Sequence, residues 1–154
     1  MSAATVAPGS TERPKSAESG PCHACSSCQS PHYQYVLPPG TTPLYEPQEI
    51  DFPTTFLSYP LDKIPVMENR FHNALAWVDL HVGRVLDGLA ARGLLETTAI
   101  LVVSDHGEAF LEHGLPTHGT QLLEEQVRTA MLARLPGVAP RHLGEPVSVL
   151  DGVP

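Results

Sequence analysis

The residues best suited to chemistry lie in one short stretch, Ser104–Gly119, which reads SDHGEAFLEHGLPTHG. It holds three histidines and three carboxylates, namely His106, His113, His118, Asp105, Glu108 and Glu112. An adjacent carboxylate and imidazole suit a divalent ion such as Zn²⁺ or Mn²⁺, whereas Mg²⁺ and Ca²⁺ prefer oxygen ligands. Asp105 and His106 are therefore candidate metal ligands. The alternative is a polar loop in which Asp105 caps the next helix and His106 is solvated.

The residues before Asp105 predict the element that positions it. The run TTAILVVSD is apolar without alternation, which is typical of a strand buried on both faces of a parallel sheet. In such sheets ligands bind beyond the carboxyl ends of the strands. Successive side chains of a strand point to opposite faces, so Asp105 and His106 can share one ion only if the backbone turns there. Gly107 permits such a turn.

A long helix is predicted over residues 67–92, directly before this strand. Its apolar residues recur at spacings of four and three and form one face: Phe71, Leu75, Val78, Val82, Val85 and Leu89. Polar residues such as Arg70 and Asn73 are expected to lie largely off this face. Gly93 is the expected C-terminal stop. A long helix followed closely by an apolar strand is one limb of an α/β layer fold.

The remaining segments are less regular. Residues 1–30 are rich in Pro, Ser and Ala with few large apolar side chains, which predicts a disordered tail. Residues 31–66 carry many prolines and are expected to form an extended, ordered surface segment made mostly of turns. A second helix is predicted over 122–127 and a short strand over 129–135.

Composition excludes some classes of function. The formal net charge of −8 argues against a nucleic-acid-binding protein, because no basic stripe is present to neutralise phosphates. The sequence contains no run of about eighteen apolar residues, so it predicts no membrane span. The chain shows neither a secretory signal nor an anchor, so the sequence assigns no compartment.

The three cysteines, Cys22, Cys25 and Cys28, form a cluster that offers a rival interpretation. With His23 inside, the cluster could be a knuckle that binds zinc or an iron–sulfur centre. The fourth Cys followed by Pro that completes a bacterial ferredoxin run is absent. The alternative is a disordered tail with incidental cysteines.

An ordered series of motifs resembles the C-terminal part of a sulfatase-like hydrolase or transferase of the alkaline phosphatase superfamily. The series comprises VDLHVGRVLDGLAARGLL, the strand ending in SDHGE, the later THG, and EEQVRTAMLARLPG. The resemblance implies an α/β fold: part of an alkaline-phosphatase-like parallel-sheet layer with flanking helices over residues 31–154, after the tail of residues 1–30. Relatives are often periplasmic, extracellular or membrane-tethered.

The resemblance also implies roles for individual residues. Asp105 and His106 of the DHG motif correspond to metal ligands for Zn, Mn, Ca or Mg. His118 corresponds to a catalytic residue that contacts the sulfate or phosphate group or its leaving oxygen. His32, in PHYQY, corresponds to a substrate-facing histidine, although Gln34 stands where proline is usual. For His118 the alternative is a solvated loop histidine.

Three further polar residues are expected to have supporting or incidental roles. Glu108 is predicted to be a first-turn carboxylate or one that orients a ligand. His113 is expected to be solvent-exposed. Arg128 is expected to brace the loop or to pair with Glu124 four residues earlier.

The nucleophile segment of the family, such as CxPxR, is not found in this sequence. Asp105 and His106 alone supply two protein ligands, fewer than the three or four of a stable catalytic site. The sequence therefore predicts a fragment of a metal-dependent enzyme that hydrolyses or transfers sulfate or phosphate ester groups, inactive on its own. A non-catalytic interaction protein that keeps the sheet is a third hypothesis.

Overall fold

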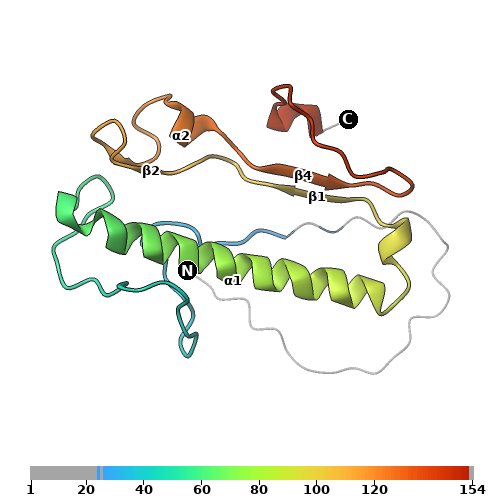
Figure 1. Cartoon of the computed structure of the whole chain (residues 1–154), viewed down its shortest axis with the longest axis horizontal. Coiled ribbons are helices and arrows are strands. Elements are labelled where there is room, and N and C mark those ends of the chain that lie inside the picture. The colour runs from blue at the N-terminus through green and yellow to red at the C-terminus, as the bar shows by residue number, and fades with distance from the viewer. Residues whose placement is uncertain (1–23, 25, 153–154) are drawn as a thin grey trace.

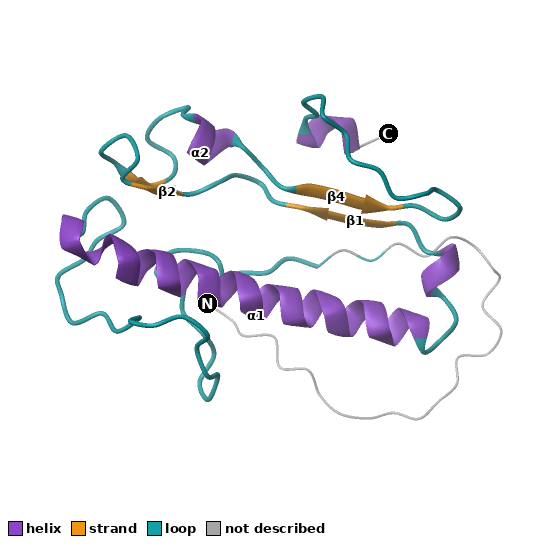
Figure 2. Ribbon diagram, in the orientation of Figure 1, coloured by secondary structure: helices purple, strands orange, loops and turns teal. Residues whose placement is uncertain are grey.

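The computed structural model describes residues 24 and 26–152, and one long helix dominates it (Figure 1). The helices and strands are α1 (Ile64–Ala90), β1 (Ile100–Val103), β2 (Ala109–Phe110), β3 (Pro116–Thr117), α2 (Glu124–Val127) and β4 (Met131–Arg134). Short 3₁₀ turns cover Leu61–Lys63, Leu95–Thr97 and Val149–Gly152. Loops and turns connect these elements and make up most of the described chain outside α1 (Figure 2). Within the described part, no helix has the length and apolar character to cross a membrane.

The predicted long helix is confirmed, with its start three residues earlier than expected. Pro65 lies in the first turn of α1, where its missing N–H costs no hydrogen bond. The predicted stop at Gly93 is also confirmed, because Gly93 has a φ of 68°. Its N–H donates to Ala90 O at 2.9 Å, and Leu94 N donates to Leu89 O at 2.9 Å. This pair of bonds is the Schellman arrangement that ends many helices.

The expected division of α1 into an apolar and a polar face is wrong at several positions. Asn73 is buried at 2% exposure, whereas Leu75 and Val85, on the expected apolar face, are exposed at 42% and 63%. The buried residues of α1, Val66, Met67, Asn73 and Ala74, all lie in its N-terminal half. Helical spacing identifies a face, but only the packing partners decide how much of its length is covered.

The expected strand is present as β1, but the buried parallel sheet is not confirmed. β1 pairs antiparallel with β4, in the register Ile100↔Arg134 to Val103↔Met131. Three of the four residues of β1 are exposed. The apolar run correctly indicated a strand; it does not specify the partner or its direction. The observed fold is therefore a mixture of one long helix and small antiparallel sheets, consistent with part of an α/β domain.

A second hairpin, β2–β3, lies inside the histidine-rich stretch and was not predicted. Ala109 pairs with Thr117 and Phe110 with Pro116. Two-residue strands are too short to show an alternating pattern, so periodicity cannot reveal them. The hairpin lies next to the N-terminal half of α1 (Figure 1).

The hydrophobic core lies between this hairpin and the N-terminal half of α1. Its buried members are Tyr35, Tyr59, Met67 and Ala74. Phe71 and Phe110 pack against them with ring centroids 5.3 Å apart. Residues 31–66 were predicted to be a surface segment, and they consist largely of turns. They nevertheless contribute Tyr35 and Tyr59 to the core, because aromatic rings bury a large apolar area from irregular backbone too.

The predicted tail of residues 1–30 lies mostly outside the described residues, as do Cys22 and Cys25. Cys28 is described and is exposed. The predicted second helix is present as the single turn of α2, and the predicted strand over 129–135 is present as β4.

Candidate active site

The sheet fixes the chain up to the residue that precedes Asp105. Ser104 N donates to Ala130 O at 3.0 Å, and Ala130 N donates to the Ser104 hydroxyl oxygen at 2.8 Å. The first of these bonds extends the β1–β4 ladder by one residue, and the second adds a side-chain bond beside it. Asp105 is therefore the first residue that leaves the sheet, and β4 determines where it does so.

Gly107 anchors the following loop to α2. Its N–H donates to Gln126 O at 2.8 Å. A Cβ atom at this position would overlap the carbonyl oxygen of Glu125 and would lie 2.8 Å from that of Arg128. Glycine is required here by this close approach of two backbones, and not by a left-handed turn, since Gly107 is not among the residues with positive φ.

Asp105 and His106 lie side by side on this loop. Asp105 Oδ2 is 3.8 Å from His106 Nε2, and their side chains are 89% and 39% exposed. Ligand atoms lie about 2.0–2.2 Å from Zn²⁺, so two atoms that share one ion are at most about 4.4 Å apart. The observed separation meets this limit. Asp105 and His106 therefore fit a shared divalent ion.

The orientation of His106 also suits a metal ligand. Its Nδ1 lies 2.8 Å from the carbonyl oxygen of Gly107. A carbonyl oxygen can only accept, so Nδ1 carries the proton and Nε2 keeps its lone pair in the neutral ring. Metal-bound histidines are commonly oriented by such a bond from the other ring nitrogen.

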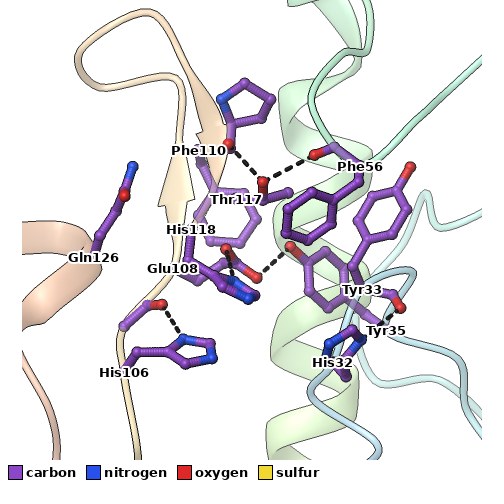
Figure 3. Close-up of polar contacts among 12 residues, drawn as sticks. His32, Tyr33, Tyr35, Phe56, His106, Glu108, Phe110, Thr117, His118 and Gln126 are labelled. Carbon is purple, nitrogen blue, oxygen red and sulfur yellow. Dashed lines mark hydrogen bonds and ion pairs between the residues drawn. The ribbon is translucent and has the colours of Figure 1, made fainter. Parts of the chain in front are cut away.

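His118 is largely buried beside this pair and is held on several sides (Figure 3). Its Nδ1 lies 3.1 Å from Glu108 Oε1, and its ring centroid lies 3.8 Å from that of His106 and 5.2 Å from that of Phe56. Thr117, directly before it, has a φ of 64° and donates its hydroxyl to Phe56 O at 2.9 Å. A positive φ at a β-branched residue is a strained conformation, and it persists only where the surroundings determine it.

His32 lies near the N-terminal end of the described residues, far from His118 in sequence but beside it in the fold. Its ring centroid lies 6.0 Å from that of His118, with the two rings nearly perpendicular. Its Nδ1 lies 3.1 Å from Tyr33 O. The four residues singled out from the sequence, His32, Asp105, His106 and His118, are therefore neighbours.

A pocket of about 300 Å³ opens beside these residues. Its lining residues are Asp105, His106, His118, Gly119, Gln121, Leu122, Gln126 and Val127. The pocket joins the loop after β1, the end of β3 and α2. Among residues 24 and 26–152, no group of three or more His, Cys, Asp or Glu side chains is arranged to hold a metal ion.

Two neighbours of His118 were underestimated from the sequence. Glu108 was expected to have a supporting role, and its side chain is 4% exposed and contacts His118 directly. Tyr35 was not singled out, and its hydroxyl donates to Glu108 Oε2 at 2.8 Å. Tyr35 is the last residue of PHYQY, the segment already chosen for His32. That motif was the signal that could have found it.

His113 is exposed as expected, but it has a partner. Its Nδ1 lies 2.7 Å from Glu125 Oε1, and the imidazole is 60% exposed. The contact links the tip of the β2–β3 hairpin to α2. Arg128 pairs with Glu124 at 3.4 Å, as predicted, and both of these side chains are highly exposed. Such an exposed pair contributes little to stability.

The His113–Glu125 contact predicts a pH-dependent stability. The hydrogen bond from His113 holds the pKa of the Glu125 carboxyl below its ordinary value of 4.5. The His113–Glu125 contact therefore stabilises the folded chain fully above pH 4.5. This stabilisation is lost as the pH falls through the lower pKa that Glu125 has in the folded state. We expect His113→Gln to lower Tm more at about pH 6 than at about pH 3, because protonation of Glu125 weakens the contact at the lower pH. An equal decrease at both pH values would contradict this origin.

Comparison with known proteins gives one consistent result. Residues 21–154 match the profile of the family described as Sulfatase. The chain is 29% identical to Sulfatase ppz1 of Metarhizium majus over 107 residues. The aligned region covers 69% of this chain and 23% of that protein. The chain is 34% identical to Choline-sulfatase of Rhizobium meliloti over 80 residues, and here the aligned region covers 52% of this chain and 15% of that protein.

A third relative agrees with these two. The uncharacterized sulfatase YidJ of Escherichia coli is 32% identical over 78 residues, covering 51% of this chain and 16% of that protein. The chain thus spans less than a quarter of the length of each of these relatives. No solved structure matches the chain significantly.

Proposed function

Because the chain belongs to the sulfatase family, we propose that its pocket is part of the active site of a metal-dependent enzyme that acts on sulfate esters. The sulfatase family acts on sulfate esters and generally depends on a divalent metal ion. The observation that carries the proposal is the convergence of Asp105, His106 and His118 on one pocket. Phosphate esters are the alternative substrates, because the sulfate and phosphate groups of such esters are both tetrahedral oxyanions.

Asp105 and His106 are the residues that would hold the metal ion. A divalent ion held there would polarise the ester and lower the pKa of the attacking group. The carboxylate of Asp105 supplies negative charge, and His106 presents the lone pair of Nε2 because its Nδ1–H is bonded to Gly107 O. The mixed oxygen and nitrogen pair suits Zn²⁺ or Mn²⁺ better than Mg²⁺ or Ca²⁺.

His118 would contact the group that is transferred or its leaving oxygen. Its Nδ1 is occupied by Glu108, so Nε2 is the ring atom available to a ligand in the pocket. As an imidazolium, with a second proton on Nε2, His118 would donate to the charge that develops on the ester oxygen in the transition state. His32, whose ring lies 6.0 Å from that of His118, would face the substrate from the opposite segment of the chain.

The ligand count sets what this chain does by itself. Asp105 and His106 provide two protein ligands, and a catalytic zinc site has three. We propose that residues 31–154 correspond to the C-terminal portion of a sulfatase-like domain. Without further ligands and a nucleophile, these residues bind a metal ion weakly and do not turn over an ester.

Metal binding tests the proposal directly. We expect the full chain to bind Mn²⁺, measured as loss of the electron paramagnetic resonance signal of the free ion, with Asp105→Ala lowering the affinity by at least about tenfold. Mn²⁺ is a better probe than Zn²⁺, because the thiols of the cysteine cluster favour Zn²⁺ and would compete for it.

Glu124→Ala is the matched control, since it removes an exposed carboxylate that does not line the pocket. Equal Mn²⁺ affinity in the wild type and in Asp105→Ala would remove the metal assignment. The same preparations are assayed against an aryl sulfate and a bis-aryl phosphate, with no turnover expected. Turnover that Asp105→Ala abolishes would disprove the expected inactivity of the isolated chain.

A further inference from the structure

The carboxylate of Glu108 lies in the middle of a largely buried chain of three polar side chains. Tyr35 donates its hydroxyl to Oε2 at 2.8 Å, and Oε1 lies 3.1 Å from His118 Nδ1 (Figure 3). Glu108 is 4% exposed, His118 17% and Tyr35 1%. Tyr35 precedes α1, Glu108 follows β1 and His118 follows β3, so that only folding brings these residues together.

The directions of these hydrogen bonds follow from the chemistry of the groups. Burial, and next the neighbouring Glu108, raise the pKa of Tyr35, so that the phenol keeps its proton and donates. An ionised carboxylate can only accept. With Glu108 as a carboxylate, Oε1 accepts from Nδ1–H of His118, and the neutral ring then has no proton on Nε2.

We propose that Glu108 is a positioning residue that holds His118 as the Nδ1–H tautomer with Nε2 left for a ligand in the pocket, and that Tyr35 holds Glu108. The assignment deepens the proposed function, because it rests on His118 as the residue that contacts the ester. The proposal specifies which ring nitrogen of His118 carries the proton. This position determines whether a neutral His118 accepts or donates a hydrogen bond toward a ligand.

Packing alone does not account for this choice. His106 contacts the face of the His118 ring and Phe56 lies nearly perpendicular to it, at interplanar angles of 32° and 84°. These contacts restrict the plane of the ring. They place no hydrogen-bond acceptor at either nitrogen, so they cannot select a tautomer. A measurement of the tautomer therefore separates a positioning role of Glu108 from a merely structural one.

The test is a long-range ¹H–¹⁵N correlation spectrum of the histidine side chains in the full-length chain at about pH 8, where an ordinary imidazole is neutral. The His118 signals are assigned by their loss in His118→Gln. We expect the wild type to favour the Nδ1–H tautomer by about tenfold, the equivalent of one hydrogen bond to a charged acceptor. Glu108→Gln should weaken this preference, because Tyr35 and His118 bond to different carboxylate oxygens, the amide replaces one of these oxygens by a donating NH₂ group, and the remaining acceptor is uncharged.

Tyr35→Phe keeps the buried ring and should reduce the preference without abolishing it. Glu124→Gln is the control that should leave it unchanged. An Nε2–H tautomer in the wild type overturns the proposal, as does an unchanged preference in a Glu108→Gln variant whose near-ultraviolet circular dichroism matches the wild type. If Glu108→Gln does not fold, the wild-type tautomer and the response to Tyr35→Phe decide the question.

The tautomer is measured without metal or ester, so the two proposals fail separately. Absence of Mn²⁺ binding would remove the proposed function and leave the Glu108–His118 assignment standing. A wrong tautomer with normal Mn²⁺ binding would remove the positioning role alone.

Discussion

Replacing Gly107 by alanine is expected to destabilise the chain by about 3 kcal/mol, because the new methyl group has no space. It would overlap the carbonyl oxygen of Glu125 and lie 2.8 Å from that of Arg128, and neither backbone atom can rotate away. The loop must then separate from α2, which breaks the bond from Gly107 N to Gln126 O. Since Gln126 and Asp105 line the same pocket, Mn²⁺ affinity should fall together with stability.

Urea denaturation of Gly107→Ala and of a matched glycine variant measures this effect. Gly83 lies within α1, and a Cβ there meets no atom within 4 Å. Gly83→Ala should therefore stabilise the chain by about 0.5–1 kcal/mol, because alanine has the higher helix propensity. Equal effects of the two substitutions would show that the Gly107 contact does not constrain the fold.

Replacing Asn73 by alanine is expected to cost about 2–4 kcal/mol, because three partly buried backbone groups lose their hydrogen-bond partner and the buried amide leaves a gap. Asn73 Oδ1 accepts from Leu44 N at 2.8 Å and from Tyr45 N at 2.9 Å, and its Nδ2 donates to Tyr45 O at 2.9 Å. The side chain thus ties the segment before α1 to the helix. Tm should fall by about 2–4 °C for each kcal/mol in a chain of this length.

Asn69, one turn earlier, is the control for this substitution. Its single bond, from Nδ2 to Pro47 O at 3.0 Å, is exposed. Asn69→Ala should cost about 0.5 kcal/mol, the lower end of the range for one hydrogen bond. If Asn73→Ala is no more destabilising than Asn69→Ala, the three bonds of Asn73 do not hold the segment to the helix.

Both predictions concern residues that the sequence placed incorrectly or incompletely. Asn73 was expected off the buried face of the helix, and Gly107 was expected to permit a turn. In each case the residue is required by a segment distant in sequence, residues 44–45 for Asn73 and α2 for Gly107. Helical periodicity and turn preferences are local properties and contain no information about such partners.

The sequence by itself determined the elements whose signals are local. The spacing of apolar residues gave α1, Gly93 gave its end, and the β-branched run gave β1. The motif order gave the family, which the comparisons confirm. These features depend on the conformational preferences of neighbouring residues or on their order, and both can be read along the chain.

Only the tertiary structure decided which groups meet. The antiparallel pairing of β1 with β4 and the exposure of β1 differ from the buried parallel strand that the same residues predicted. The sequence selected His118, but the chain from Tyr35 through Glu108 to its Nδ1 exists only in the folded molecule. The physical reason is that a hydrogen bond depends on a distance of about 3 Å between two atoms, whatever their separation in sequence.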